Sequence, residues 1–167
     1  MTAPVDPMEF RRACSLFATG VAVVTTHHGD VFAGMTINSF ASVSLDPSLV
    51  LWSIRDNARS RGIFEGAGRF AINILASEQI AEARHFSKHT LEAFEGEPMS
   101  ISARGLPLLP GALAHLECET GAIHDGGDHR IIVGEVVALS ARDGDPLLFF
   151  RGRLAAGFGA FEHSGHA

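Results

Sequence analysis

The chain has 167 residues, of which 46% are hydrophobic and 19% charged, and its formal net charge at pH 7 is −6. This length and composition predict a single globular domain over residues 1–167, since a disordered chain carries more charge and fewer apolar side chains. The negative charge and the lack of a Lys/Arg run argue against a nucleic-acid partner, and no apolar run is long enough to cross a membrane.

The first predicted element is a helix from Asp6 to Gly20. Asp6 is a favoured N-cap, Pro7 is a favoured first helical residue, and Gly20 is a typical stop. The residues of its expected apolar stripe recur at i, i+3, i+4 and i+7, and they are Phe10, Ala13, Cys14 and Phe17.

Strands are predicted for most of the remaining chain. The apolar and β-branched runs that predict them span residues 21–26, 31–36, 49–54, 70–75, 112–123, 130–141 and 146–158. Two short helices interrupt this series, one capped by Asp56 or Asn57 and ending near Gly66, the other running from Ser77 to Phe86. The Pro- and Gly-containing stretch from 87 to 110 predicts a long loop or lid.

The order of these elements favours a mainly β fold. Strands outnumber helices, and they do not alternate regularly with them. No G-x-G-x-x-G turn joins a strand to a helix, as it does in doubly wound α/β sheets. A closed β-barrel is therefore the favoured architecture.

The segment from Thr36 to Ser44 concentrates small hydroxyl residues, one amide and one aromatic between two apolar runs. A buried pair of strands would favour Val, Ile and Leu here. Short polar side chains and main-chain N–H groups suit a flat ligand with a polar edge, and a flavin ring has such an edge beside an apolar face. The alternative interpretation is a Ser/Thr-rich β-turn in which Phe40 fills the barrel.

Positive charge follows the next predicted strand, at Arg55, Arg59 and Arg61. If a helix begins at Asp56 or Asn57, its first N–H groups and its dipole favour an anion there. Arg59 or Arg61 would then add charge-assisted hydrogen bonds to a phosphate. The alternative interpretation is the solvated first turn of a surface helix.

The turn Gly127-Asp128-His129 lies between two predicted strands. His129 is able to hydrogen-bond a cofactor amide or pyrophosphate, with a charge that is adjustable near neutral pH. A hairpin corner explains the same residues without any function.

Other chemistry is excluded by its missing motifs. His85 and His89 lack the Glu that a zinc-binding H-E-x-x-H helix carries, and the chain has no hydrolase elbow, P-loop or catalytic-cysteine signature. We therefore predict no metal site and no catalytic side chain. Cys14 and Cys118 are isolated, and the sequence shows no signal peptide, which predicts a reduced, cytoplasmic protein.

An ordered set of short motifs runs through the chain. Its members are Phe17-Ala18-Thr19-Gly20-Val21, Gly34-Met35-Thr36-Ile37-Asn38-Ser39-Phe40, Ser42-Val43-Ser44-Leu45-Asp46-Pro47, Ala71-Ile72-Asn73-Ile74-Leu75, Phe86-Ser87, Gly127-Asp128-His129 and Pro146-Leu147-Leu148-Phe149-Phe150-Arg151-Gly152. In this order and over this length, the set resembles the short-chain flavin reductases, the reductase components of two-component flavin-dependent monooxygenases.

The resemblance implies a split β-barrel of the Greek-key, FMN-binding type, with a few short flanking helices, assembled as a homodimer. It also implies binding of FMN or FAD, a hydride donor that is NADH or NADPH, and a partner flavin-dependent monooxygenase that receives the reduced flavin. The residues expected along the flavin ring and ribityl chain are Thr36, Ile37, Asn38, Ser39, Phe40, Ser42 and Val43. Those expected at the phosphate and closing over it are Asn57, Ala58, Arg59, Phe86, Ser87 and Lys88. His129 is expected to contact the nicotinamide nucleotide, with Arg151 nearby.

Two other functions remain open from the sequence. One is a flavoprotein on the same barrel that reduces another acceptor, such as a corrinoid or an iron centre. The other is a flavin-binding module without reductase activity.

Overall fold

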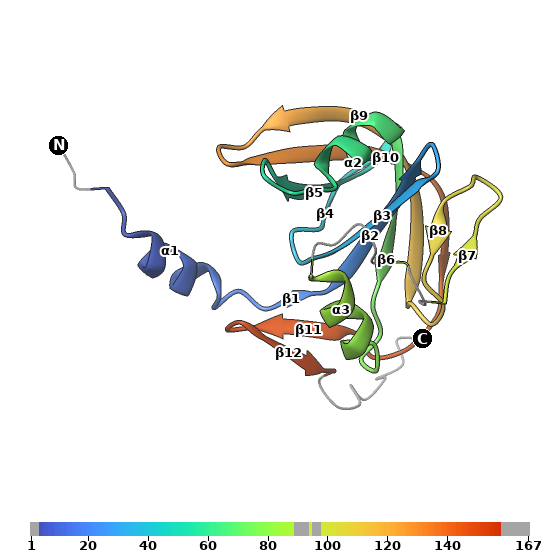
Figure 1. The fold of residues 1–167 in the computed structure, drawn as a ribbon. Helices are drawn as coiled ribbons and strands as arrows, with labels where there is room; N and C mark the ends of the chain where they lie inside the picture. Colours follow the sequence, from blue (N-terminus) through green and yellow to red (C-terminus); the bar gives the residue numbers. More distant parts are fainter. Residues whose placement is uncertain (1–3, 89–93, 95–97, 158–167) are drawn as a thin grey trace.

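The computed structural model describes residues 4–88, 94 and 98–157. Figure 1 shows a strongly curved sheet, a smaller sheet beside it, and an N-terminal helix that projects away from both. The elements in chain order are α1 (Pro7–Cys14), β1 (Thr19–Gly20), β2 (Ala22–His28), β3 (Val31–Ile37), β4 (Ala41–Leu45), β5 (Ser48–Arg55), α2 (Arg61–Ala67), β6 (Arg69–Ile74), α3 (Ile80–Phe86), β7 (Ser100–Ile101), β8 (Pro107–Leu108), β9 (Ala114–Asp125), β10 (His129–Ala141), β11 (Leu147–Phe150) and β12 (Arg153–Ala156). No helix in the described ranges is long and apolar enough to span a membrane.

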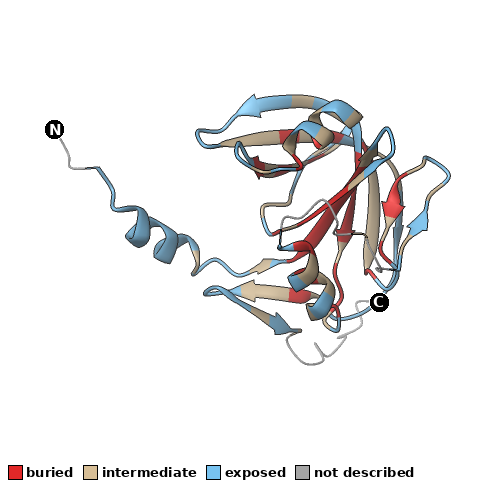
Figure 2. Cartoon of the chain, viewed as in Figure 1, coloured by how far each residue is buried: buried red, intermediate tan, exposed pale blue. Residues whose placement is uncertain are grey.

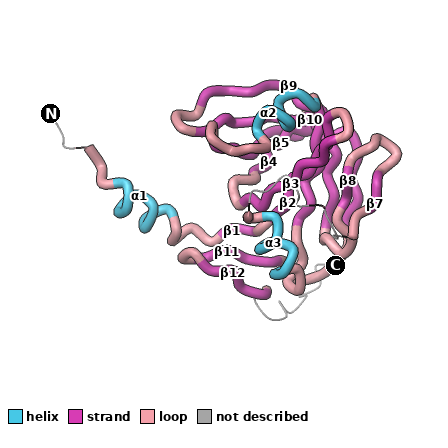
Figure 3. Tube along the Cα trace, viewed as in Figure 1, coloured by secondary structure: helices cyan, strands magenta, loops and turns pink. Residues whose placement is uncertain are grey.

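The strands form three antiparallel sheets. The largest has seven strands in the order β3-β2-β6-β9-β10-β5-β4, and the others are β1-β11-β12 and the hairpin β7-β8. Figure 3 shows how strands dominate the fold and how few segments are helical. The mainly β prediction is confirmed. Over the described residues the sheets do not join into one closed cylinder, so the split barrel is confirmed and the closed barrel is wrong.

Strand β2 separates two groups of buried apolar side chains. Ala22 and Val24 belong to a larger cluster around Trp52, Phe64 and Phe70, whose rings meet at 4.9 and 5.7 Å between centroids. Val23 points to the other face, as alternation along a strand requires, and joins a smaller cluster that includes Phe86 from α3. Figure 2 shows a run of buried positions along β2, β3 and β6, between these two clusters.

The N-terminal helix is shorter than the prediction. It ends at Cys14, with Ser15 as its C-cap, because the N–H groups of Leu16 and Phe17 bond to carbonyls three residues back. Thr19–Gly20 then pairs with β11. The expected apolar stripe does not pack on the body of the protein: α1 contains no buried residue, and Phe10 is 63% exposed.

The helix predicted from Asp56 or Asn57 begins later, at Arg61, with Ser60 at its N-cap. The intervening residues form tight turns, in which Ala58 N–H bonds to the Arg55 carbonyl and Arg61 N–H to the Ala58 carbonyl. The carboxylate of Asp56 is used elsewhere, as described below, so it does not cap the helix.

Two predictions after residue 86 differ from the structure. The stretch from 146 to 158 is two short strands, β11 and β12, because Arg151 and Gly152 adopt positive φ angles of 50° and 77° and reverse the chain. Phe158, at the end of that predicted strand, lies outside the described residues. The region predicted as a loop from 87 to 110 contains the hairpin β7-β8, while its residues 89–93 and 95–97, including His89, lie outside the described residues.

Candidate functional site

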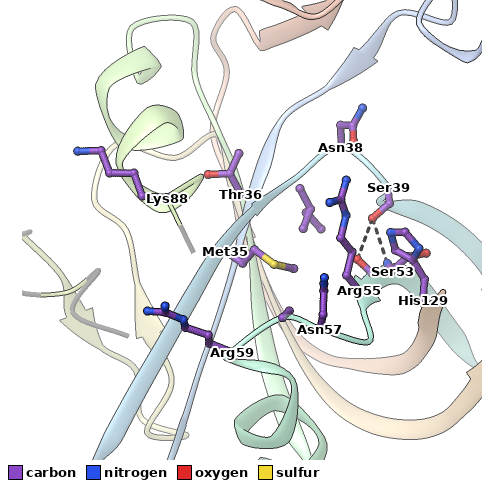
Figure 4. Close-up of a pocket in the computed structure, with 12 residues that line it drawn as sticks. Met35, Thr36, Asn38, Ser39, Ser53, Arg55, Asn57, Arg59, Lys88 and His129 are labelled. Carbon is purple, nitrogen blue, oxygen red and sulfur yellow. Dashed lines mark hydrogen bonds between the residues drawn. The ribbon is translucent and has the colours of Figure 1, made fainter. Parts of the chain in front are cut away.

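A cavity of about 730 Å³ lies where β3, β5 and β10 approach the turns beside α2 and α3 (Figure 4). This volume falls within the range of cofactor-sized sites. The residues that line it are Met35, Thr36, Ile37, Asn38, Ser39, Ser53, Arg55, Asn57, Ala58, Arg59, Lys88 and His129. Segments far apart in sequence are thus brought to one hollow.

The end of β3 and the residues after it form the polar wall of the cavity. Ser39 is fixed by β5, because its hydroxyl accepts the N–H of Ser53 at 3.0 Å and lies 3.4 Å from the Ser53 carbonyl. Thr36 is fixed by α3, since its hydroxyl donates to the Ala83 carbonyl at 2.7 Å. The Asn38 side chain is exposed and makes no hydrogen bond with any described residue. Its amide is therefore the group of this wall that remains available to a ligand.

The seat of α3 explains where Phe86 lies. Gly34 on β3 has no side chain, and a Cβ there would lie 2.7 Å from two atoms of the Phe86 ring. Phe86 is fully buried in the smaller cluster, so it anchors α3 and does not line the cavity. Lys88, two residues further on, does line it.

Positive side chains line the cavity, and no acidic side chain is among its described lining residues. Arg55, Arg59 and Lys88 form no ion pair or side-chain hydrogen bond within the described ranges. Two neighbouring arginines are committed elsewhere: Arg61 and Arg130 both bond to Oδ1 of Asp56 at 3.0 Å. Asp56 therefore ties the turn that carries Arg59 to the start of β10.

The start of β10 brings His129 to the cavity. Its Nδ1 lies 2.6 Å from Oδ1 of Asp128. This hydrogen bond, together with the charge of His129, lowers the pKa of the Asp128 carboxyl. The ionised carboxylate orients the imidazole, and the other ring nitrogen is left without a hydrogen bond to a described residue.

The structure brings nine of the residues expected at the site to this one cavity. They are Thr36, Ile37, Asn38, Ser39, Asn57, Ala58, Arg59, Lys88 and His129. The other six lie elsewhere. Phe40 packs against the larger cluster and lines a separate hollow of about 60 Å³, and Ser42 and Val43 are exposed on the edge strand β4.

The remaining expected residues also lie off the cavity wall. Ser87 donates its hydroxyl to the Arg84 carbonyl at 2.8 Å, and Phe86 is in the smaller cluster. Arg151 sits in the turn between β11 and β12, where its N–H bonds to the Ser15 carbonyl and its guanidinium lies 5.2 Å from the Phe150 ring centroid.

Three lining residues were missed from the sequence: Met35, Ser53 and Arg55. The signal for the last two was the alternation in β5. Trp52 and Ile54 are fully buried, so the polar residues between and after them face the other side of the strand.

The lining residues fit a flavin nucleotide. Met35 and Ile37 supply apolar surface, Asn38 offers an amide donor and acceptor, and the cations suit a phosphate. An isoalloxazine ring needs both apolar contact and hydrogen bonds along one edge, and this wall provides both.

Comparisons with known proteins agree with this fit. A profile of the flavin reductase like domain matches residues 14–157. The FMN reductase (NADH) SmoA of Agrobacterium fabrum is 47% identical over 143 residues, which cover 86% of this chain and 82% of SmoA. The reductase subunit HsaB of a flavin-dependent monooxygenase from Mycobacterium tuberculosis is 39% identical over 155 residues, covering 91% and 83% of the two chains.

Solved structures show the same likeness in three dimensions. The NADH:FAD oxidoreductase SgcE6 of Streptomyces globisporus, solved with NAD and FAD fragments, superposes with a TM-score of 0.88 at 36% identity. The match covers 96% of this chain and 100% of that one. On its sequence and its fold, the chain belongs to the flavin reductase-like domain family.

Proposed function

We propose that this protein is an NAD(P)H-dependent flavin reductase, acting as one domain that binds FMN or FAD and a nicotinamide nucleotide in the cavity at the end of β3. The observation that carries the proposal is that one hollow of about 730 Å³ combines an apolar and amide-bearing wall with cations that form no ion pair among the described residues. The family match and the names of relatives support it, since they include NADH-dependent flavin and FAD reductases.

The chain's own residues bind and orient, while the cofactors supply the hydride chemistry. Asn38 and the main chain beside it hold the polar edge of the flavin, and Met35 and Ile37 contact its apolar face. Arg59, with Asn57, Ala58 and Lys88, holds the phosphate. His129, kept in place by Asp128, orients the nicotinamide nucleotide.

The reduced flavin is supplied to a partner monooxygenase. Relatives named as reductase components support this step, among them HsaB and the reductase component of 4-hydroxyphenylacetate 3-monooxygenase from Thermus thermophilus, which is 37% identical over 143 residues. We place this exchange in the cytoplasm, where the free thiols of Cys14 and Cys118 stay reduced.

The test is anaerobic reduction of flavin by the purified protein. We expect NADH or NADPH to bleach added FMN or FAD rapidly. In His129→Ala the flavin dissociation constant should stay unchanged, while the bleaching rate falls or the half-saturating donor concentration rises about tenfold, as expected for one lost polar contact. His124→Ala, which removes an exposed histidine outside the cavity, is the matched control.

The outcomes separate the alternatives. Bound flavin that neither NADH nor NADPH bleaches would identify a binding module. Weakened flavin binding with normal reduction kinetics in His129→Ala would move that residue to the flavin.

We also propose that the protein is a homodimer in which α1 lies on a second copy. The helix has no buried residue, and Figure 1 shows it extended from the body of the chain. Three apolar side chains on and just after α1, those of Met8, Phe10 and Phe17, are 81%, 63% and 77% exposed. Such a group of exposed apolar side chains marks a surface that another protein covers.

Sedimentation equilibrium tests the dimer. We expect twice the chain mass of 17.8 kDa for the unaltered protein and the single-chain mass for the double variant Phe10→Asp, Phe17→Asp. Glu9→Ala, on the same helix, should remain dimeric. A single-chain mass for the unaltered protein would refute the proposal.

A further inference from the structure

Arg55 is a charged residue that lines the cavity and that the proposed function does not yet assign to a ligand group. It ends β5, lines the cavity, and has neither an ion pair nor a side-chain hydrogen bond within the described part of the chain. The nearby arginines Arg61 and Arg130 differ, since Asp56 holds both at 3.0 Å. Arg55 is therefore free to bind an anion in the cavity.

Arg55 and His129 are direct cross-strand partners in the β5–β10 pair. Side chains of such partners lie on the same face, with about 4.5–5.5 Å between their Cβ atoms. Figure 4 shows both on one side of the cavity, close to Ser53, with Arg59 and Lys88 on the opposite side. The cavity thus has two positively charged ends.

The Asp128 carboxylate, next to His129, does not cancel this charge. Asp128 is bonded to His129, and the pKa of Asp128 is lowered first by that hydrogen bond, with Arg55 the smallest of the causes. Asp128 also does not line the cavity. A ligand in the cavity therefore meets the Arg55 guanidinium and the His129 ring without an intervening acid.

We propose that Arg55, beside His129, binds the pyrophosphate of the nicotinamide dinucleotide. A guanidinium matches two adjacent anionic groups by bidentate hydrogen bonding, and the pyrophosphate is the anionic group common to NADH and NADPH. With Arg59 and Lys88 at the flavin phosphate, the two ends hold two nucleotides in one cavity. This assignment rests on the proposed function, because it requires both nucleotides to share the site.

Equilibrium binding of ADP-ribose tests the assignment without catalysis. ADP-ribose carries the pyrophosphate and lacks nicotinamide, whereas adenosine lacks both. By calorimetry on the flavin-loaded protein, Arg55→Ala should weaken ADP-ribose binding about 10-fold to 100-fold and leave adenosine binding unchanged. FMN binding, titrated on the flavin-free protein, should also stay unchanged. Arg55→Lys should lie between, because a lysine keeps the charge and loses the bidentate geometry.

Arg104→Ala is the matched control, since it removes an exposed positive charge outside the cavity. It should leave ADP-ribose binding unchanged. Equal ADP-ribose affinity in Arg55→Ala and the unaltered protein would overturn the assignment, as would no measurable ADP-ribose binding by the unaltered protein. A loss confined to FMN would place Arg55 on the flavin and overturn it as well.

Failure of the proposed function has a different signature. In that case the unaltered protein does not bleach flavin with NADH or NADPH, whatever the variants bind. If the unaltered protein bleaches flavin and Arg55→Ala binds ADP-ribose normally, only the assignment of Arg55 fails.

Discussion

Arg59→Ala is expected to weaken FMN binding by about 1–3 kcal/mol and to leave riboflavin binding nearly unchanged. Arg59 lines the cavity, and its guanidinium has no ion pair within the described ranges, so no internal interaction is lost with it. Riboflavin differs from FMN only by the phosphate. The measurement is a flavin titration of both ligands, compared as a ratio of dissociation constants.

Arg61→Ala is the control for this experiment. Arg61 is two residues away and equally charged, but it bonds to Asp56 and Glu65 and does not line the cavity. Its removal should leave the FMN-to-riboflavin ratio unaltered. If Arg59→Ala lowers the affinity for both ligands equally, Arg59 does not contact the phosphate.

The second large effect is expected for a substitution at Gly34, and it concerns the stability of the fold. Gly34→Ala should lower the free energy of unfolding by about 1–3 kcal/mol, because the new Cβ meets Phe86 at 2.7 Å and Phe94 at 3.0 Å. Phe86 is fully buried and has no room to retreat without moving α3. Urea denaturation measures the change as a lower midpoint at constant slope.

The same variant should weaken FMN binding, because α3 leads into Lys88 at the cavity. Gly62→Ala is the matched control, since nothing lies within 4 Å of a Cβ at that position in α2. We expect it to keep or slightly raise stability, since alanine favours a helix over glycine. Full stability of Gly34→Ala would show that α3 is not seated on Gly34 as described.

Local sequence patterns were sufficient to predict where most strands lie, but not where each helix or strand begins and ends. Alternating and apolar runs predicted the hairpin of β2 and β3 and the long pair β9 and β10. Such runs are informative because apolar and polar residues alternate along a strand that buries one face. The start of α2 was missed because Asp56 binds Arg130, a residue far along the chain. No local pattern records such a partner.

The candidate site, too, was predictable only where local sequence marks it. The polar segment after β3 and the turn at His129 were recognised by composition and by resemblance. Arg55 was not assigned to the cavity, because its place depends on the register that sets it opposite His129. Phe86 was expected to close over the flavin phosphate, and Arg151 was expected near the nicotinamide nucleotide. Only the packing of α3 and the turn after β11 show where these two residues lie.

Strand β5 divides its two faces between different tasks. Val50, Trp52 and Ile54 are buried in the larger cluster, while Ser53 and Arg55 face the cavity. A substitution at either of the last two positions changes the cavity wall without removing a buried apolar side chain. We therefore expect that substitutions on the cavity-facing side of β5, in evolution or by saturation mutagenesis, change nucleotide preference. The buried side chains on the other face of β5 keep the strand folded.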